Sequence, residues 1–243
     1  GQEVHAILYR PSAISADRSL ILVPGISELG CRHPRLVALS RILATNGFVV
    51  LTPDIVPLRQ FRIAPEALDH MSFWLSQLEF LDESVPARRI GLAGISFSGT
   101  LALIAAAKPE NRHRVAFVLS IGAYNDLEAC AEAWFSASAK TVGDGYYPIR
   151  FYARWLAMLA ALDLLSDAED RSVLQTVLTR LLLQQEPPPL TPQAGAQAGR
   201  WYRLARARED QSDPELARAI VGRLSQISAR LAPKKRSKRW LHV

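Results

Sequence analysis

The sequence has few cysteines, no long apolar run and no metal-binding pattern. Two cysteines among 243 residues, Cys31 and Cys130, are too few for a disulfide framework, and no cysteine–histidine spacing is typical of zinc. The best candidate for a membrane span, residues 155–165, is too short and contains Asp163, and no charged-then-apolar leader opens the chain. We therefore expect a cytoplasmic protein, although a segment preceding Gly1 would leave that location open.

Acidic residues are scarce toward the C-terminus. From Arg200 onward the chain has twelve Lys or Arg but four Asp or Glu, so this region carries more than the whole net charge of +6. The run from Lys234 to Arg239, with Trp240 beside it, has the composition of a phosphate or membrane-surface contact. No nucleic-acid-binding pattern accompanies it, which favours a solvated linker. We expect no nucleic-acid partner, disfavour membrane contact through this tail, and make no prediction of the oligomeric state.

Apolar runs alternate with helical patterns over the first half of the chain. A loose alternation predicts a first strand, and continuous apolar runs predict four buried ones. The predicted strands are residues 4–9, 20–23, 48–52, 89–93 and 115–121, and the predicted helices between them are residues 34–45, 64–81 and 100–107. This alternation predicts an α/β fold, a mostly parallel sheet with helices on both faces.

The pattern changes after Asp126, where strands give way to helices. The predicted helices are residues 127–139, 149–165, 168–185, 199–208 and 214–231. We interpret this block as a helical insertion over the carboxyl edge of the sheet, and residues 240–243 as the start of one more strand. The predicted organisation is a core over residues 1–125, a helical cap or lid over 126–232, and a basic linker with the start of a further core strand over 233–243.

One stretch carries a pattern typical of nucleophilic catalysis. Between the strand at residues 89–93 and the helix at 100–107 lies Gly94-Ile95-Ser96-Phe97-Ser98-Gly99, a G-x-S-x-G pattern with Ser98 at its fifth position and glycine one residue later. A strand, a tight turn with serine at its apex and a helix form a nucleophile elbow. The alternative is an ordinary turn in which Ser96 or Ser98 caps the next helix.

Four further stretches surround this turn in a familiar order. They are Leu22-Val23-Pro24-Gly25, residues 33–39 (HPRLVAL), residues 47–54 (GFVVLTPD) and residues 122–127 (GAYNDL). With the elbow, they resemble the α/β-hydrolase superfamily, and the chain looks closest to its esterase and dienelactone-hydrolase-like branch. The resemblance covers residues 4–127 well and the helical block only loosely, as a cap.

The resemblance implies a set of roles for the residues around the turn. Ser96 would be the nucleophile, and the backbone N–H groups of Phe97 and Ile26 would bind the oxyanion, each stabilising the transition state by about 3 kcal/mol. Many relatives have His-Gly where this chain has Pro24-Gly25, a change in the loop rather than in the backbone donor. The implied substrate is a small carboxylic ester or lactone, and neither a cofactor nor a metal is implied.

The rest of the catalytic triad has no clear place in this sequence. In the superfamily an acid and then a histidine follow the serine. No histidine occurs between His113 and His242, and His242 resembles a structural position within a strand. The C-terminal acid and histidine segment of the family therefore lacks a counterpart here, which we attribute either to truncation or a frame shift near Lys234, or to loss of catalysis.

Two residues are alternative partners for the serine. His33 follows an early strand and is expected at the same sheet edge as Ser96, where it is either a base or a surface loop histidine. Asp126 follows the strand after the elbow, where it is either the acid or the cap of the next helix.

Two hypotheses remain. The first is a serine hydrolase that forms an acyl-enzyme on Ser96. The second is a catalytically inactive or truncated hydrolase-fold protein that binds a small ligand. Aromatic residues of the predicted cap either favour an apolar acyl group or form the core of the cap: Trp134, Phe135, Tyr146, Tyr147, Phe151 and Trp155.

Overall fold

The computed structural model describes residues 4–12, 15–16, 18–81, 90–135, 146–207 and 213–231. The chain forms two compact units, residues 1–126 and residues 127–243. The run from Lys234 to Arg239, Trp240, His242 and the predicted strand start at residues 240–243 lie outside the described residues.

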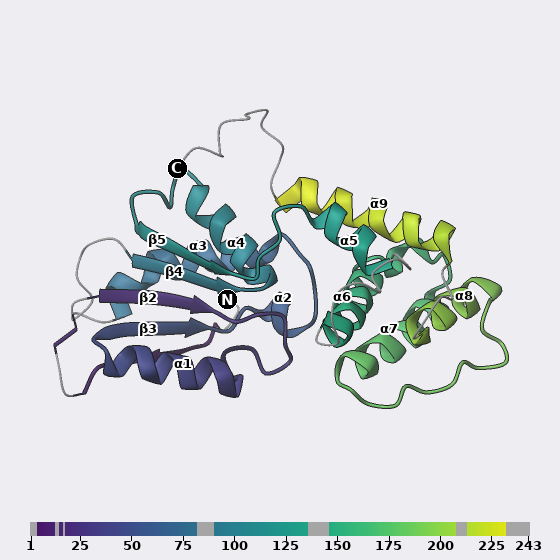
Figure 1. Cartoon of the computed structure of the whole chain (residues 1–243), viewed down its shortest axis with the longest axis horizontal. Coiled ribbons are helices and arrows are strands. Elements are labelled where there is room, and N and C mark those ends of the chain that lie inside the picture. Colours follow the sequence, from purple (N-terminus) through teal and green to yellow (C-terminus); the bar gives the residue numbers. More distant parts are fainter. Residues whose placement is uncertain are drawn as a thin grey trace. The chain divides into compact units, whose positions relative to one another are not determined.

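One sheet of five strands organises the first unit (Figure 1). The strands are Ala6–Tyr9 (β1), Arg18–Val23 (β2), Phe48–Pro53 (β3), Ile90–Ile95 (β4) and Val115–Ile121 (β5). Their order is β1-β3-β2-β4-β5, with β1 antiparallel to β3 and every other pair parallel. The predicted, mostly parallel sheet is confirmed, and its reversed strand lies at an edge.

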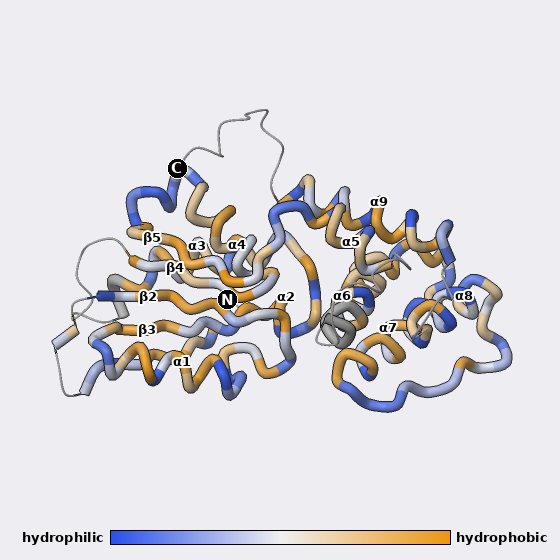
Figure 2. The backbone as a smooth tube through the Cα atoms, viewed as in Figure 1, coloured by the Kyte–Doolittle hydropathy of each residue, from blue (hydrophilic) through white to orange (hydrophobic). Residues whose placement is uncertain are grey.

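The three central strands are almost wholly buried. Five of the six residues are buried in each of β2, β3 and β4, and Figure 2 shows these strands as mainly apolar. A strand covered on both faces needs apolar side chains at every position, which is why these segments read as continuous apolar runs. Thr52 is a buried exception, and its hydroxyl donates a hydrogen bond to the carbonyl oxygen of Ile7 on β1.

Helices cover both faces of this sheet (Figure 1). The helical segments of the first unit are the 3-10 helix Gly30–Arg32 (η1) and the α-helices Pro34–Thr45 (α1), Val56–Arg59 (α2), Glu66–Leu81 (α3) and Phe97–Ala107 (α4). On one face, Leu36 of α1 packs into a cluster with Leu20 and Val50. On the other face lie α3 and α4, whose Leu75 and Leu101 are fully buried.

Helix α1 shows how local sequence sets these boundaries. Pro34 is its first residue, where the missing N–H costs no helical hydrogen bond. The helix ends at Thr45, and the N–H groups of Asn46 and Gly47 after it donate to carbonyl groups of the last turn. Gly47 has a φ of +87°, which glycine adopts without strain.

The edge strand β5 departs from the predicted cover of both faces. Phe117, Leu119 and Ile121 are 47%, 49% and 46% exposed. They pair with Gly91, Ala93 and Ile95 of β4, so their side chains lie on the same face of the sheet as those residues. Ala93 packs in the cluster that contains Leu36, so this is the face that α1 covers over the neighbouring strands. Within the described residues no helix covers this end of that face.

The described part of the second unit is helical, as predicted. Its α-helices are Leu127–Phe135 (α5), Tyr146–Ala160 (α6), Ala168–Leu182 (α7), Ala196–Arg206 (α8) and Pro214–Leu231 (α9), and Leu162–Leu164 forms a short 3-10 helix. Helix α5 packs against α6 and α9, and α7 packs against α6 and α8. Their apolar faces form one core, in which Leu174, Trp201 and Leu224 are fully buried.

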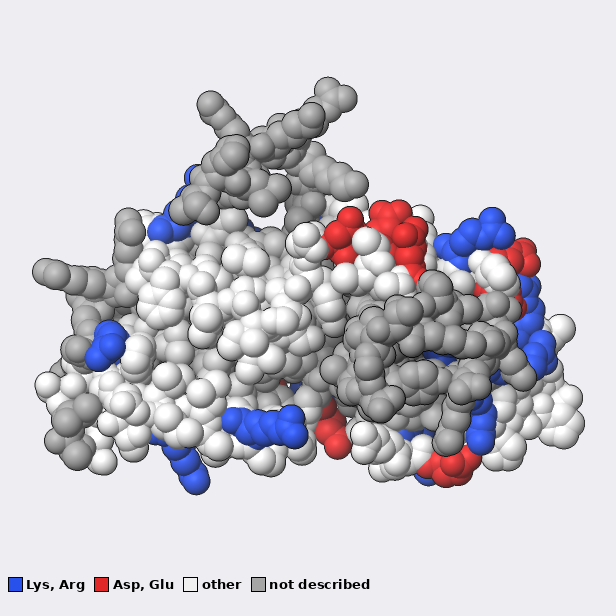
Figure 3. Space-filling model, viewed as in Figure 1, with Lys and Arg blue, Asp and Glu red and all other residues white. Residues whose placement is uncertain are grey.

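Two side chains of α6 hold the end of α8 by hydrogen bonds. Arg154 and Trp155 of α6 donate hydrogen bonds to the carbonyl oxygens of Ala207 and Ala205 at the end of α8. These bonds satisfy carbonyl groups that a helix end leaves without partners. Figure 3 shows acidic and basic side chains intermixed over this unit and fewer of them over the first unit on the same face.

The aromatic residues of this unit mainly contribute to its packing. Trp134 and Phe135 are buried, and the rings of Phe151 and Trp155 are stacked with centroids 6.2 Å apart. Tyr146 and Tyr147 have no described side chain. Of the two interpretations of these aromatics, the described side chains favour the core of the unit.

Candidate active site

The serine turn between β4 and α4 is strained. Ser96 has a φ of +59° and a ψ of −131°, a backbone conformation that residues other than glycine rarely adopt. Ser96 is the residue just before α4, and its N–H donates to the carbonyl oxygen of Ile121 at 2.7 Å. Its side chain is half-buried and makes no capping hydrogen bond to the helix. The hydroxyl therefore does not serve as an N-cap.

The small residues on either side of Ser96 permit a very close approach of strand and helix. A Cβ atom at Gly94 would overlap the backbone of Ser98 and lie 2.7 Å from the nitrogen of Gly99. A Cβ atom at Gly99 would lie 2.8 Å from Oγ of Ser120. Packing therefore requires glycine at both positions. Gly99, one residue beyond the fifth position of the G-x-S-x-G pattern, is needed for the same close contact.

Ser98 has a structural function that its small size alone does not predict. Its hydroxyl is completely buried, accepts a hydrogen bond from the N–H of Ile95 at 3.0 Å, and lies 2.8 Å from the carbonyl oxygen of the same residue. It also lies 3.3 Å from the carbonyl oxygen of Val23 at the end of β2. The Ser98 side chain thus connects the end of β4 to the start of the loop that follows β2.

The two predicted oxyanion donors belong to the segments that Ser98 connects. Phe97 is the first residue of α4, where a backbone N–H has no partner within the helix. Ile26 lies in the loop after β2, and a Cβ atom at Gly25 beside it would lie 3.5 Å from the carbonyl oxygen of Ile95. The loop therefore passes the carboxyl end of β4 at van der Waals distance. The positive end of the α4 dipole also favours negative charge near Ser96.

The loop after β5 is fastened to the same helix. The hydroxyl of Thr100 donates to the carbonyl oxygen of Tyr124 at 2.7 Å and accepts from the N–H of Tyr124 at 3.0 Å. Asp126 is exposed, follows two residues later and directly precedes α5. Its place fits both roles that the sequence leaves open, a helix cap and an acid near the carboxyl edge of the sheet.

The histidines are distributed over both edges of the sheet. His33 is half-buried and lies between η1 and α1 on the carboxyl side of β2, whereas His113 is exposed in the turn before β5, at the opposite edge. His5 precedes β1, and because β1 is reversed, His5 lies at the carboxyl edge too. No residue in the described part of the chain, His33 among them, forms a hydrogen bond with Oγ of Ser96.

Metal binding and membrane insertion find no support in the described ranges. No three His, Cys, Asp or Glu side chains of the described residues are grouped as metal ligands would be. Among the helices that the structure describes, none combines the length and the apolar character that crossing a bilayer requires.

Comparison with known proteins gives distant structural likenesses. No family model and no curated protein sequence matches this chain. Proline iminopeptidase from Mycobacterium smegmatis is 15% identical with a TM-score of 0.40, and the alignment covers 93% of this chain and 64% of that one. The siderophore hydrolase EstB from Aspergillus fumigatus is 14% identical with a TM-score of 0.38, over 93% of this chain and 97% of that one. At such low values no activity is transferred from either protein.

The class of fold follows from the geometry of the first unit. A mostly parallel sheet, helices on both faces and a strained serine between a strand and a helix make up the α/β-hydrolase fold. The first unit has this arrangement.

Proposed function

We propose that the chain is a serine hydrolase that cleaves a small carboxylic ester or lactone through an acyl-enzyme on Ser96. The observation that carries the proposal is the strained conformation of Ser96, combined with a hydroxyl that does not cap the helix. Backbone strain of this kind persists where the surrounding structure enforces it, and it is concentrated at functional sites. Here Gly94, Ser98 and Gly99 enforce it.

The proposed reaction begins with attack of Oγ of Ser96 on the acyl carbonyl carbon. The negative charge that develops on the carbonyl oxygen is bound by the N–H groups of Phe97 and Ile26. The serine proton passes to a base and then to the leaving alcohol, or to the ring oxygen of a lactone. Water then hydrolyses the acyl-enzyme and restores the serine.

The base and the acid of this scheme are separate proposals. His33 is the proposed base, because it lies on the carboxyl side of the sheet that also carries Ser96. Asp126 is the proposed acid, because its loop is bonded to α4 through Thr100 and Tyr124. The helical unit is proposed to be the cap that selects the acyl group, and the proposed partner is a small ester-like substrate.

Hydrolysis of p-nitrophenyl acetate, p-nitrophenyl butyrate and γ-butyrolactone tests the function. The wild-type chain is compared with Ser96→Ala and His33→Gln, and His113→Gln is the matched control because His113 lies at the opposite edge. We expect Ser96→Ala to abolish turnover and His33→Gln to lower kcat by about a hundredfold or more, the usual contribution of a general base. Turnover that survives Ser96→Ala would contradict the proposal. Loss of activity in His113→Gln would contradict the role of His33.

A second function is favoured by one observation, the lack of a hydrogen bond between Ser96 and any described base. A serine hydroxyl without a base is a weak nucleophile at neutral pH. On this alternative the chain binds a small ligand at the same site without cleaving it. Saturable binding of an ester without turnover, with the same affinity in Ser96→Ala, would favour the alternative over the hydrolase.

A further inference from the structure

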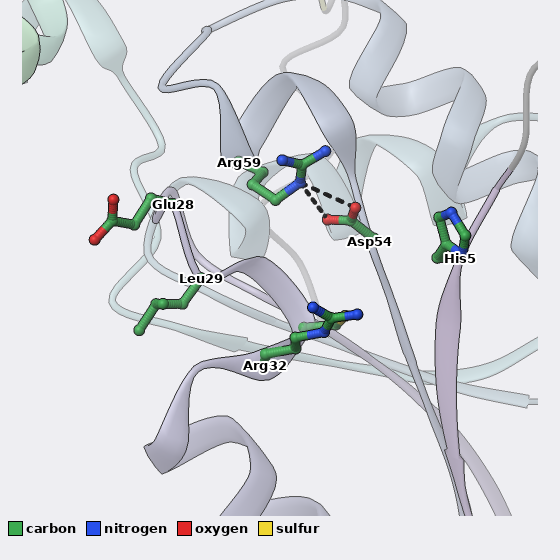
Figure 4. A pocket seen from close by; sticks show the side chains of 7 residues that line it. His5, Glu28, Leu29, Arg32, Asp54 and Arg59 are labelled. Atoms are coloured by element: carbon green, nitrogen blue, oxygen red, sulfur yellow. Dashed lines mark hydrogen bonds and ion pairs between the residues drawn. The ribbon is translucent and has the colours of Figure 1, made fainter.

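A polar pocket lies at the carboxyl edge of the sheet, and no residue of the serine turn lines it. Its volume is about 370 Å³, and its walls come from His5 before β1, the loop after β2 and the loop after β3 (Figure 4). The backbone holds these walls together: the N–H of Asp54 donates to the carbonyl oxygen of His5 at 2.8 Å. The pocket has the size of a small-molecule site.

An ion pair fixes one wall of this pocket. Nε of Arg59 donates to both carboxylate oxygens of Asp54, at 3.0 and 3.2 Å. Asp54 is mostly buried, and a Cβ atom at Gly30 would lie 2.8 Å from its Oδ1 and 3.4 Å from Cδ of Arg59. The pair is therefore packed against the loop after β2. Because the carboxylate engages only Nε, the two Nη groups of Arg59 keep their N–H donors for another partner.

A second guanidinium group shares the pocket. Arg32 lines it, and within the residues that the structure describes it forms no ion pair. Burial and the charge of Asp54 raise the pKa of the Cys31 thiol, whereas the charges of Arg32 and Arg59 oppose this shift. Both guanidinium groups are therefore close enough to influence the Cys31 thiol. The thiol stays neutral, so it provides no negative charge to pair with them. Glu28 also lines the pocket, but Figure 4 shows its carboxylate pointing away from Asp54 and Arg59.

We propose that this pocket binds the carboxylate of a small organic acid, held between the side chains of Arg32 and Arg59. Asp54 neutralises one of the two guanidinium charges, which leaves about one positive charge for the ligand. A monoanion matches that balance better than a doubly charged phosphate. The planar fork of a guanidinium group also fits a carboxylate in bidentate geometry. Leu29, which also lines the pocket, offers an apolar contact for the rest of the ligand.

The proposal concerns binding and is independent of chemistry at Ser96. The residues that carry it come from η1 and from the loop and helix after β3, none of which belongs to the serine turn. Ser96→Ala is therefore expected to bind the acid as the wild-type chain does. Failure of the hydrolase proposal would leave this one standing, and the reverse also holds.

The test follows backbone and arginine Nε–H signals in ¹H–¹⁵N NMR spectra during titration with sodium benzoate at constant ionic strength. Benzamide, which has nearly the same shape without the charge, is the ligand control. Arg32→Gln is the test variant, and Arg35→Gln is its matched control, because Arg35 is exposed on α1 and does not line the pocket. Arg59→Lys keeps a charge but removes the planar fork.

We expect saturable shifts of residues around the pocket with benzoate and none with benzamide. We expect Arg32→Gln to weaken binding by about tenfold, Arg59→Lys to weaken it as well, and Arg35→Gln to leave it unchanged. Shifts that never saturate, equal binding of benzamide, or unchanged binding in Arg32→Gln would overturn the proposal. Tighter binding of inorganic phosphate than of benzoate would overturn the choice of a carboxylate.

Discussion

Replacing Ser98 by alanine removes a buried hydroxyl group that holds the serine turn. The change leaves the N–H of Ile95 without its acceptor and removes the donor near the carbonyl oxygens of Ile95 and Val23. A buried donor left without a partner costs about 1–3 kcal/mol. Alanine recovers roughly 0.5 kcal/mol through its higher helix propensity. The free energy of unfolding should therefore fall by roughly 0.5–2.5 kcal/mol, which lowers Tm by roughly 1–10 °C for a chain of this size.

Replacing Ser98 by glycine shows whether the hydroxyl group or a complete G-x-S-x-G pattern stabilises the turn. Ser98→Gly restores the G-x-S-x-G pattern but loses the same hydrogen bonds and adds a helix penalty of about 1 kcal/mol relative to alanine. We expect the order of stability in urea unfolding to be wild type, then Ser98→Ala, then Ser98→Gly. Ser76→Ala is the control, because the half-buried hydroxyl of Ser76 bonds only within its own helix, to the carbonyl oxygen of Phe73 and from Nε2 of Gln77. A Ser98→Gly variant as stable as the wild-type chain would refute the role of this hydroxyl.

Three further predictions concern other parts of the chain. Gly30→Ala places a Cβ atom 2.8 Å from Oδ1 of Asp54 at a φ of +47°, so thermal unfolding should show a loss of about 1–3 kcal/mol, and an unchanged Tm would contradict this packing. Leu224→Ala empties a fully buried site in the second unit and should cost about 2–5 kcal/mol in denaturant unfolding, whereas a cost below that range would mean that the core collapses around it. The hydrogen bond from Arg200 lowers the pKa of Asp213 in the folded protein. The ionised carboxylate therefore stabilises the fold fully above the unfolded pKa of about 3.9, and this stabilisation is lost as the pH falls through the lower folded pKa. Asp213→Asn keeps an acceptor for the N–H of Leu216, so its stability deficit should be largest at neutral pH and vanish near pH ~2, and a deficit independent of pH would contradict the charge effect.

The sequence predicts α1 and strand β5 well because each is determined by local pattern. Residues 34–45 and 115–121 have the predicted bounds, and both are delimited by proline or glycine at one end. The four residues of α2 show no helical period and include Pro57, so no pattern predicts this helix. Helix α4 begins at Phe97 rather than at residue 100, because tight packing, not helix propensity, determines where it starts.

The candidate site is predicted only in part, because some of its features depend on tertiary structure. The pattern identifies the turn around Ser96 and the glycines on either side of it, Gly94 and Gly99. The bond between Ser98 and Ile95 depends on how strand and helix meet, which the residue types alone do not reveal. His5 lies at the carboxyl edge because β1 is antiparallel to β3. The sequence of a strand does not reveal its direction in the sheet, so this position could not be predicted. Asp54 is the partner of Arg59, a pairing that no sequence pattern indicates.

Reaction with a fluorophosphonate probe tests directly whether Ser96 is an activated nucleophile. The purified chain and Ser96→Ala are incubated with the probe, and the modified peptide is identified by mass spectrometry. We expect a single adduct on Ser96, absent in the variant and slower to form in His33→Gln. No adduct on the wild-type chain, or an adduct that persists in Ser96→Ala, would contradict it and leave a hydrolase fold without hydrolase chemistry at this serine.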